Sequence, residues 1–493
     1  MASSTIILIS LIGYMAFMLG VGFYYNKKGL DQSEFLLGGK KMKGWALALS
    51  ERATCESAFL MLGATGYAYT VGISAMWLLI GPFIAISLVW MFLAKKFMSE
   101  TNKYGILTLP GYFSAKFPRH ANLIRWIATT SIGGFFLFYI AAQFSGAGKT
   151  LFQVFGWDIT ISIIVTAIIV IVYSSLGGFP SVVMTDVIQS ILMVALLVIL
   201  PIVGFFTANA KGLSITAELS KAGSGYLDWT AGLVGFALAL MIFSESSWAF
   251  GYLGGSPQLS SRYMALKNEK DAKVGRNVAI VWMLLAFPGV IMIGLLGITL
   301  YGTNAVVDAE MILPFMVVDL MPPWIAGILL SGILAAVMST ADSQLLVITS
   351  SISEDIIHKS LRIKLDAKKL VTISRISMIV AGALGLILAL MSKDLILVIV
   401  SWAWAGVGVT FSAAVLLAFF WKRYTGLGII ATILTGGITT IIWMSTSLEQ
   451  IISARFMAFV FAALAGIIVS ILFPEEKTVD TGKEKLAETS VTN

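Results

Sequence analysis

Polar and ionisable side chains interrupt the stretch 45–69, which is otherwise apolar and long enough to cross a bilayer. They are Glu51, Arg52, Thr54, Glu56 and Ser57. An ionisable group near the middle of a membrane is costly unless it meets a partner or a wet cavity. An interrupted helix can supply both, because its free carbonyls coordinate cations and its free N–H groups hold carboxylates. We therefore predict an ion or solute site here. The alternative is an ordinary helix start near the membrane surface, with Arg52 and Glu56 as an i,i+4 ion pair.

A second interrupted stretch, SESSWAFGYLGGSP at 244–257, begins about 190 residues after the first. It combines Glu245 with serines, aromatic residues and three glycines, and it ends at Pro257. Glycine and proline loosen helical hydrogen bonding, so this stretch is predicted to be a second discontinuous helix. Two interrupted helices at matching positions in two halves indicate the central site of a transporter. The alternative is a glycine-rich helix end that runs into a loop.

A stripe of small, oxygen-bearing residues follows within 333–356. Ala336, Ser339, Thr340 and Ser343 are spaced i, i+3, i+4 and i+7, so they share one helix face. Hard cations such as Na⁺ prefer hydroxyl, carboxylate and carbonyl oxygens. Helix packing in membranes also uses small polar residues, but it explains Asp342 poorly. The stripe therefore predicts ion binding.

Two further polar positions have two readings each. Asp186 follows a Gly-Gly-Phe-Pro turn and could cap a helix or bind a second cation. Tyr139 and Gln143 fall in the middle of an apolar run and face either a wet cavity or neighbouring helices.

The composition places these residues in a polytopic membrane protein. Of 493 residues, 58% are hydrophobic and 12% are charged, and apolar runs of bilayer length recur. A transmembrane β-barrel would show shorter, alternating segments. The only cysteine is Cys55, and both histidines fall in predicted loops, so no zinc or haem site and no organic cofactor are expected. The net charge of +7 is read as membrane topology, not as nucleic-acid binding.

Apolar runs bounded by charges or turns predict about thirteen spans. They lie near 4–25, 45–68, 73–94, 123–148, 159–175, 183–208, 229–253, 277–301, 322–347, 371–391, 395–420, 426–444 and 455–473. With the N-terminus outside, most of the 33 Lys and Arg fall in the cytoplasmic loops 26–43, 95–122, 254–276, 353–370 and 421–425 or in the polar tail. The positive-inside rule then predicts an external N-terminus and a cytoplasmic C-terminus in the cell membrane. The tail 474–493 is expected to be disordered.

The motifs together resemble the sodium:solute symporter family, and within it the bacterial proline-carrying branch. The resemblance is carried by LTLPGYFSAKF (107–117), GGFPSVVMTDVIQSILM (177–193), SWAFGYLGGSPQLSSRYMA (247–265) and WAWAGVGVTFSAAVLL (402–417), and most strongly by 322–356. It implies an all-α membrane protein with five-plus-five inverted repeats, a LeuT-like core and two discontinuous helices. The expected division is 1–44 before the core, 45–228 and 229–424 as the two repeats, and 425–473 as two C-terminal helices.

The resemblance also implies site residues. A Na⁺ site would take carbonyls of Ala53, Glu56 and Ala336 with the hydroxyls of Ser339 and Thr340. Some members of the family have a second Na⁺ site, which would map to Asp186, Ser339, Asp342 and Ser343. The solute pocket would be formed by Thr54, Ser57, Tyr139, Trp248 and Tyr252, where hydroxyls and N–H groups suit a carboxylate and aromatic faces suit a cationic nitrogen.

The chain departs from the resemblance at the first interruption. The proline-carrying branch that this chain resembles has Asp at the position of Cys55. It commonly has small residues where this chain has Glu51 and Arg52. The expected function is Na⁺-coupled import of a small solute by alternating access, with proline or a similar amino acid first. The alternatives are another solute, such as a betaine, monocarboxylate, pantothenate, sugar or sialic acid, or a solute-sensing membrane module. No enzymatic activity is expected. The expected partners are the solute, Na⁺ and the bilayer, and no oligomeric state is implied.

Overall fold

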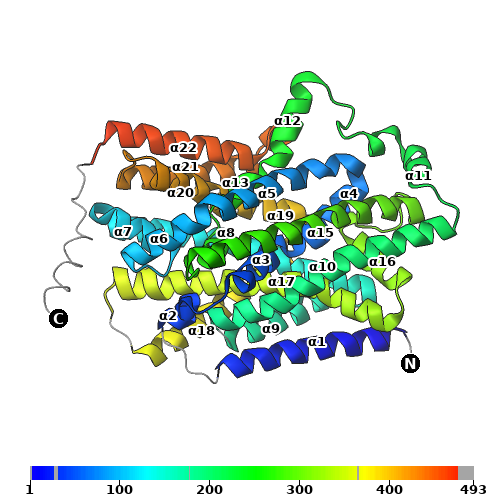
Figure 1. Ribbon diagram of the computed structural model, residues 1–493, viewed down its shortest axis with the longest axis horizontal. Coiled ribbons are helices and arrows are strands. Elements are labelled where there is room, and N and C mark those ends of the chain that lie inside the picture. The colour runs from blue at the N-terminus through cyan, green and yellow to red at the C-terminus, as the bar shows by residue number, and fades with distance from the viewer. Residues whose placement is uncertain (1–2, 27–31, 177, 364–365, 393, 476–493) are drawn as a thin grey trace.

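Helices form all of the secondary structure in this computed structural model, which describes residues 3–26, 32–176, 178–363, 366–392 and 394–475. Within these ranges no strand occurs. The long helices lie side by side in one bundle (Figure 1). Ten helical segments of the described chain are long and apolar enough to cross a membrane, and one bent pair passes the same test. The prediction of an all-α polytopic membrane protein is confirmed.

The first half of the chain begins with a peripheral helix and a short connector and then enters the bundle. The helices are α1 (Ser3–Asn26), α2 (Gln32–Leu37), α3 (Gly44–Ala58), α4 (Thr65–Val71), α5 (Met76–Leu88), α6 (Ala94–Tyr104), α7 (Leu109–Lys116), α8 (Ala121–Phe155), α9 (Ile159–Leu176), α10 (Phe179–Ala210) and α11 (Ile215–Ala222). Wider helical turns at Phe59–Ala64 and Val89–Leu93 join α3 to α4 and α5 to α6. Such π-type turns are frequent at functional sites.

The second half begins with the bent pair. Its helices are α12 (Gly235–Ser246), α13 (Trp248–Tyr252), α14 (Pro257–Met264), α15 (Glu269–Tyr301), α16 (Ile312–Leu320), α17 (Pro323–Ser350), α18 (Ala367–Met391), α19 (Ile396–Ala403), α20 (Thr410–Phe420), α21 (Gly426–Met444) and α22 (Ala454–Leu472). Gly235–Tyr252 and Pro257–Met264 are bent by 46°. Proline at the first helical position of α14 suits this restart, because its missing N–H needs no partner there.

The predicted count of thirteen spans stays a prediction. Two predicted spans, 45–68 and 73–94, fall in one continuous helical stretch, Gly44–Tyr104. The predicted span at 159–175 is a shorter apolar helix, Ile159–Ser175. The proposed repeat boundaries also remain predictions. One predicted loop is wrong in part, because 254–276 contains the buried helix α14.

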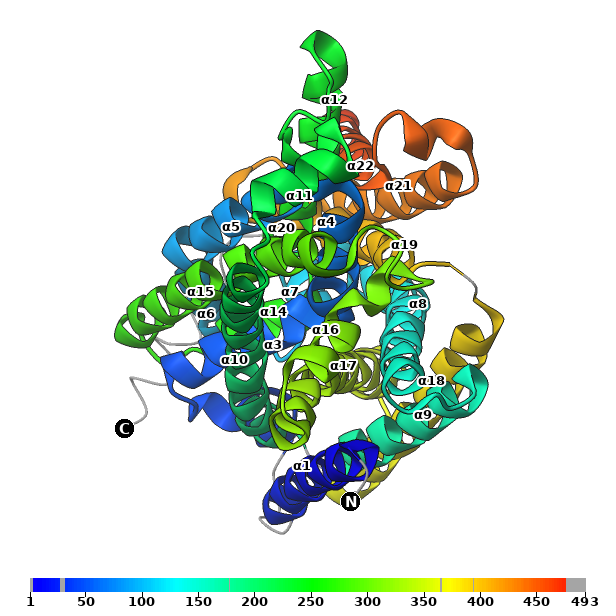
Figure 2. The same ribbon diagram turned by 90° about the vertical axis from the view of Figure 1, so that its right-hand side faces the viewer.

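Helix α17 lies at the centre of the bundle. Every residue in 329–351 is buried, so this part of the helix has no face toward lipid. It packs against α1, α3, α8 and α10, while α3 also packs against α10 and α15. Helix α1 and the pair α21 and α22 lie on opposite outer sides of the bundle (Figure 2). The polar stripe of α17 is therefore held between the first broken helix and α10.

Candidate functional site

Helix α3, the first of the two interrupted helices, breaks at Ser57. The backbone there has a φ of 48° and a ψ of −170°. This conformation is strained for a residue with a side chain and costs on the order of 1–3 kcal/mol. Side chains hold the break: the Ala58 N–H donates to the Gln143 side-chain oxygen at 3.0 Å, and the Phe59 N–H donates to Ser57 Oγ at 3.0 Å. The Phe59 N–H also reaches the carbonyl of Glu56. The predicted interruption is confirmed.

Carbonyl and hydroxyl oxygens converge between this break and α17. The hydroxyl of Ser339 lies 3.0 Å from the Ala53 carbonyl and 3.1 Å from the Ala336 carbonyl. The hydroxyl of Thr340 lies 2.9 Å from the carbonyls of both Thr54 and Ala336. All five residues are fully buried. Hydroxyls that donate to these carbonyls can rotate to face a cation, so the set offers only hard oxygen ligands.

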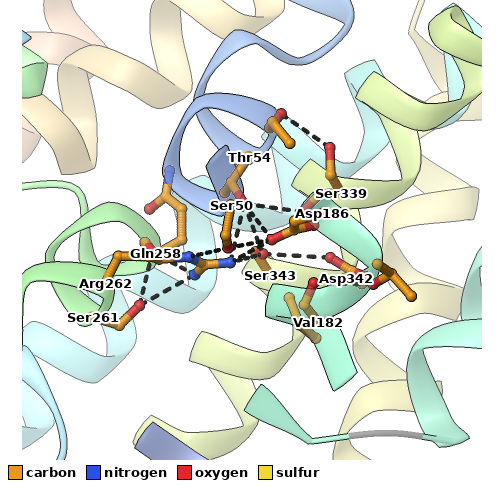
Figure 3. A network of polar contacts seen from close by, with 12 residues as sticks. Ser50, Thr54, Val182, Asp186, Gln258, Ser261, Arg262, Ser339, Asp342 and Ser343 are labelled. Carbon is orange, nitrogen blue, oxygen red and sulfur yellow. Dashed lines mark hydrogen bonds and ion pairs between the residues drawn. The ribbon is translucent and has the colours of Figure 1, made fainter. Parts of the chain in front are cut away.

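A second polar cluster is centred on Arg262 of α14 (Figure 3). Its Nη2 lies 3.0 Å from Asp186 Oδ2, and it donates to Ser343 Oγ at 2.7 Å and to Thr54 Oγ1 at 3.0 Å. Its Nε donates to Ser50 Oγ at 3.0 Å. One guanidinium thus joins α14 to α3, α10 and α17. Such charge-assisted bonds are the stronger ones in a buried site.

The same cluster retains unpaired oxygens. Asp342 Oδ1 accepts a hydrogen bond from Ser343 Oγ at 3.4 Å. Asp342 Oδ2 and Asp186 Oδ1 are buried and have no hydrogen-bond partner in the described part of the chain. Two carboxylates beside one guanidinium leave one negative charge, which a monovalent cation would balance. Asp186 lies two turns inside α10, whose N-cap is Gly178, so the reading of Asp186 as a helix cap is wrong.

Sequence reasoning missed Arg262 because it assigned 254–276 to a cytoplasmic loop. A basic residue after a glycine-rich turn is counted as topology when only hydropathy is considered. The available signal was Pro257 after Gly-Gly-Ser, which indicates the first turn of a new helix. That helix carries Arg262 back into the bundle, where its guanidinium also lies 5.3 Å from the ring of Phe179.

The charged residues of the first interruption pair with one another. Arg52 Nε donates to Glu51 Oε2 at 2.7 Å, its Nη2 reaches the other Glu51 oxygen, and its Nη1 donates to Glu56 Oε1 at 2.8 Å. Glu51 also accepts from Tyr263 OH at 2.9 Å and from Trp90 Nε1 at 3.3 Å. The i,i+4 pair considered as an alternative is therefore present. It is fully buried inside the protein.

Aromatic rings of the two broken helices meet next to the Ser57 break. The Trp248 ring lies 4.1 Å from that of Phe59, and the Tyr252 ring lies 4.7 Å from that of Trp404. Tyr139 OH lies 3.3 Å from Ser57 Oγ, and its ring is 6.4 Å from that of Trp404. Four of the five residues predicted for the solute pocket, namely Ser57, Tyr139, Trp248 and Tyr252, are thus brought together.

Thr54, the fifth, points elsewhere. Its hydroxyl contacts Arg262, Asp186 Oδ2 at 3.2 Å and Ser343 Oγ at 3.1 Å, so it belongs to the polar cluster. Trp404 joins the aromatic group although sequence reasoning gave it no role. Its Nε1 donates to the Trp248 carbonyl at 3.0 Å, which ties the indole to the second broken helix.

Two residues outside the predicted set shape this aromatic group. A Cβ on Gly251 would lie 2.1 Å from Trp404 Nε1, so only glycine permits this packing. The guanidinium of Arg455, from the outer helix α22, lies 4.4 Å from the Trp248 ring centroid. Arg455 also donates to the Ser244 carbonyl at 3.1 Å and to Ser247 Oγ at 3.2 Å. A helix outside the two predicted repeats therefore supports the second break.

A small cavity lies at the α14 side of the polar cluster. Its lining comes from α2, α10, α14 and α17, from the two residues before α7 and from the residue after α17; it includes Leu36, Thr108, Phe179, Arg262, Ser343 and Leu346. Arg262 and Ser343 thus line the cavity and also belong to the ion-pair cluster. No group of three or more His, Cys, Asp or Glu suited to a metal ion occurs among the described residues.

This arrangement defines a transporter class, and the comparisons identify the family. The model of the sodium:solute symporter family matches residues 35–436, and the chain belongs to this family. The chain is 34% identical over 473 residues to the osmoregulated proline transporter OpuE of Bacillus subtilis, covering 94% of each chain. It is 31% identical to the sodium/proline symporter of Escherichia coli over 482 residues, which cover 96% of this chain and 94% of the relative. The relatives are transporters and not enzymes.

Solved structures support the fold. A substrate-bound, outward-open Na⁺-coupled sialic acid symporter superposes with a TM-score of 0.79 at 22% identity, covering 96% of this chain and 99% of the other. Mhp1, a nucleobase-cation-symport-1 family transporter in a closed conformation, gives a TM-score of 0.53 at 14% identity and covers 92% of this chain. The chain therefore has the LeuT-like fold of sodium symporters. Family membership makes Na⁺ its coupling ion and a small molecule its solute.

Proposed function

We propose that the chain imports proline or a similar small amino acid together with Na⁺ by alternating access. The observation that carries the proposal is the convergence of the Ala53 and Ala336 carbonyls with the hydroxyls of Ser339 and Thr340 across the broken helix. The Glu56 carbonyl, at the same break, is proposed as the fifth ligand. Such a site forms only when α3 and α17 are held together, so ion binding and this helix contact stabilise each other.

The solute pocket is proposed to lie beside this ion site. Ser57 and Tyr139 offer hydroxyls, while Trp248 and Tyr252 offer aromatic faces for an apolar ring or a cationic nitrogen. The pocket and the ion site share the α3 backbone, since residues 53 and 56 face the ion while residue 57 faces the aromatic group. Sodium would therefore order the same backbone that holds the solute, and the coupling must be reciprocal.

A second Na⁺ is proposed between Asp186, Asp342 and Ser343. The two unpartnered carboxylate oxygens and the net charge of the cluster support it. Thr54 is proposed to contribute to this cluster, because its hydroxyl bonds to Asp186 and Ser343. Arg262 would then share the cluster with the ion and hold α14 against α3, α10 and α17 in the state seen here.

In the orientation expected from the positive-inside rule, the N-terminus is external and the cavity beside Arg262 faces the cytoplasm. The start of α1 and the end of α22 lie at opposite ends of the bundle, which supports termini on opposite sides of the membrane (Figure 1). We place the chain in the cell membrane. Inward movement of each Na⁺ would then gain about 2.3 kcal/mol per 100 mV of membrane potential.

Reconstituted vesicles test the proposal. Purified protein in proteoliposomes should accumulate labelled L-proline, or another member of a panel of small solutes, only when a Na⁺ gradient is imposed. A panel of betaines, monocarboxylates, pantothenate, sugars and sialic acids identifies the solute if proline is not taken up. Uptake that is equally fast with K⁺ in place of Na⁺ would refute the proposal. Solute binding without any flux would instead favour a sensing module.

A further inference from the structure

Only one oxygen of the Glu56 carboxylate is engaged. Glu56 Oε1 accepts from Arg52 Nη1 at 2.8 Å and lies 3.7 Å from the Cys55 sulfur. Glu56 Oε2 is buried and has no hydrogen-bond partner among the residues that the structure describes. The whole side chain is 1% exposed. Leaving a buried charged acceptor unsatisfied is costly, so this oxygen is expected to have a ligand.

The charges around Glu56 do not balance. Among the described residues, Arg52 is the cationic side chain that pairs with Glu56, and it is also bound through two of its nitrogens to Glu51. The three side chains therefore carry one net negative charge inside the bundle. Glu51 is satisfied by Arg52, Trp90 and Tyr263, so the unbalanced charge resides at Glu56. A buried unbalanced carboxylate requires a cation or a proton.

Aromatic residues pack against the α3 segment that follows Glu56. Ser57 Oγ lies 3.3 Å from Tyr139 OH, and the Phe59 ring lies 4.1 Å from that of Trp248. A carboxylate combined with tyrosine and tryptophan faces is the chemistry that recognises a positively charged nitrogen.

We infer that Glu56 Oε2 binds the positively charged nitrogen of the transported solute. The solute is then an amine-bearing molecule such as an amino acid, and not a simple carboxylate or a neutral sugar. This inference rests on the proposed function and narrows its substrate class. The ion ligand proposed from the same residue is its backbone carbonyl, so the carboxylate is free for the solute.

Paired probes with and without the nitrogen provide the test. L-proline and cyclopentanecarboxylate share a ring and a carboxylate, and L-alanine and propionate form a second pair. Binding to the purified protein in Na⁺ is measured by thermal shift and calorimetry. The wild type should bind the nitrogen-bearing member of a pair at least tenfold more tightly. Glu56→Gln should remove most of that preference, while the Na⁺ concentration for half-maximal stabilisation without solute stays within twofold of the wild type.

Two further variants serve as controls. Glu245→Gln makes the same chemical change at a partly buried carboxylate that accepts a hydrogen bond from Tyr67 OH at 3.1 Å, and it should keep the preference. Glu56→Asp keeps the negative charge and should retain part of the preference for the nitrogen-bearing solute. Glu56→Gln leaves the Glu51–Arg52 pair intact and removes an unbalanced charge, so it should fold.

The outcomes separate this inference from the proposed function. The inference would be overturned if Na⁺-dependent uptake were equal for solutes with and without the nitrogen. It would also be overturned if Glu56→Gln changed only the Na⁺ affinity. In both cases the symporter proposal would still stand. Loss of the preference in Glu245→Gln to the same extent would also overturn it. Absence of any Na⁺-dependent binding or uptake by the wild type would overturn both.

Discussion

The guanidinium Nη2 of Arg262 lies 3.0 Å from Oδ2 of Asp186, and both side chains are fully buried. This ion pair joins α14, after the second helix break, to α10 in the first half of the chain. The same nitrogen bonds to Thr54 on α3 and to Ser343 on α17. Four helices, α3, α10, α14 and α17, therefore meet at one side chain.

Replacing Arg262 tests this connection. Arg262→Ala leaves Asp186 and Asp342 without a resident cation, and breaking a buried pair costs about 3–5 kcal/mol. The variant should be less stable than the wild type in choline and should gain more stability from added Na⁺, because the ion can partly neutralise the carboxylates. Thermal unfolding in Na⁺ and in choline measures both effects. The stability of Arg262→Lys should lie between those of the wild type and Arg262→Ala, since lysine keeps the positive charge but not the several N–H donors of the guanidinium.

A double variant provides the control for Arg262. Asp186→Asn combined with Arg262→Ala removes both charges of the pair, so the double variant should be more stable in choline than Arg262→Ala alone. If Arg262→Ala unfolds at the wild-type temperature in both salts and transports normally, the guanidinium does not hold these segments together.

Loss of the Thr340 hydroxyl should weaken the primary Na⁺ site. Thr340 Oγ1 lies 2.9 Å from the Ala336 carbonyl of the proposed site and 2.9 Å from the Thr54 carbonyl beside it. Thr340→Ala should therefore raise the Na⁺ concentration for half-maximal uptake at least tenfold, about 1.4 kcal/mol. Thr349→Ala is the matched control: it lies on the same buried helix, and its hydroxyl has no partner among the described residues. Equal Na⁺ dependence in Thr340→Ala and the wild type would exclude Thr340 as a ligand.

Adding a methyl group at Gly251 should damage the solute pocket. Its Cβ would lie 2.1 Å from Trp404 Nε1, so the indole must move and lose its bond to the Trp248 carbonyl. Solute affinity should fall at least tenfold in Gly251→Ala. Gly133→Ala should change nothing, because no atom lies within 4 Å of the added carbon. Titration of uptake against solute concentration compares them, and unchanged affinity in Gly251→Ala would remove Trp404 from the pocket.

Arg455 should affect the pocket from outside the two repeats. Its guanidinium lies 4.4 Å from the Trp248 ring and bonds to the Ser244 carbonyl. Arg455→Met keeps the bulk but loses the charge, so the apparent solute affinity should fall severalfold while the Na⁺ affinity of the solute-free protein is retained. A parallel loss of both affinities would show that Arg455 supports the fold as a whole.

Much of this arrangement could be predicted from local sequence. The oxygen stripe of α17 follows from helical spacing, and the break near Ser57 follows from polar residues inside an apolar run. Periodicity and hydropathy are local properties, so they locate helices and their polar faces well. The resemblance to a family added the facing Ala53 carbonyl and the aromatic residues, which lie far apart in the chain.

The rest depended on packing between distant segments. Arg262 looked like a loop charge, because nothing local shows that α14 turns back into the bundle. Thr54 was predicted to face the solute, yet its hydroxyl lies with Asp186 and Ser343. The Arg455 contact with Trp248 joins residues more than 200 positions apart. Such contacts are set by how the helices pack, which the residues themselves do not encode locally.

Uphill transport tests the central proposal most directly. Proteoliposomes containing equal concentrations of L-proline inside and outside receive Na⁺ outside only, and the internal proline is followed with time. Na⁺-coupled symport predicts that internal proline rises above the external level and that a Na⁺ ionophore abolishes the rise. If no solute of the panel is concentrated by the Na⁺ gradient, or if the same accumulation occurs with K⁺ alone, the proposal is contradicted.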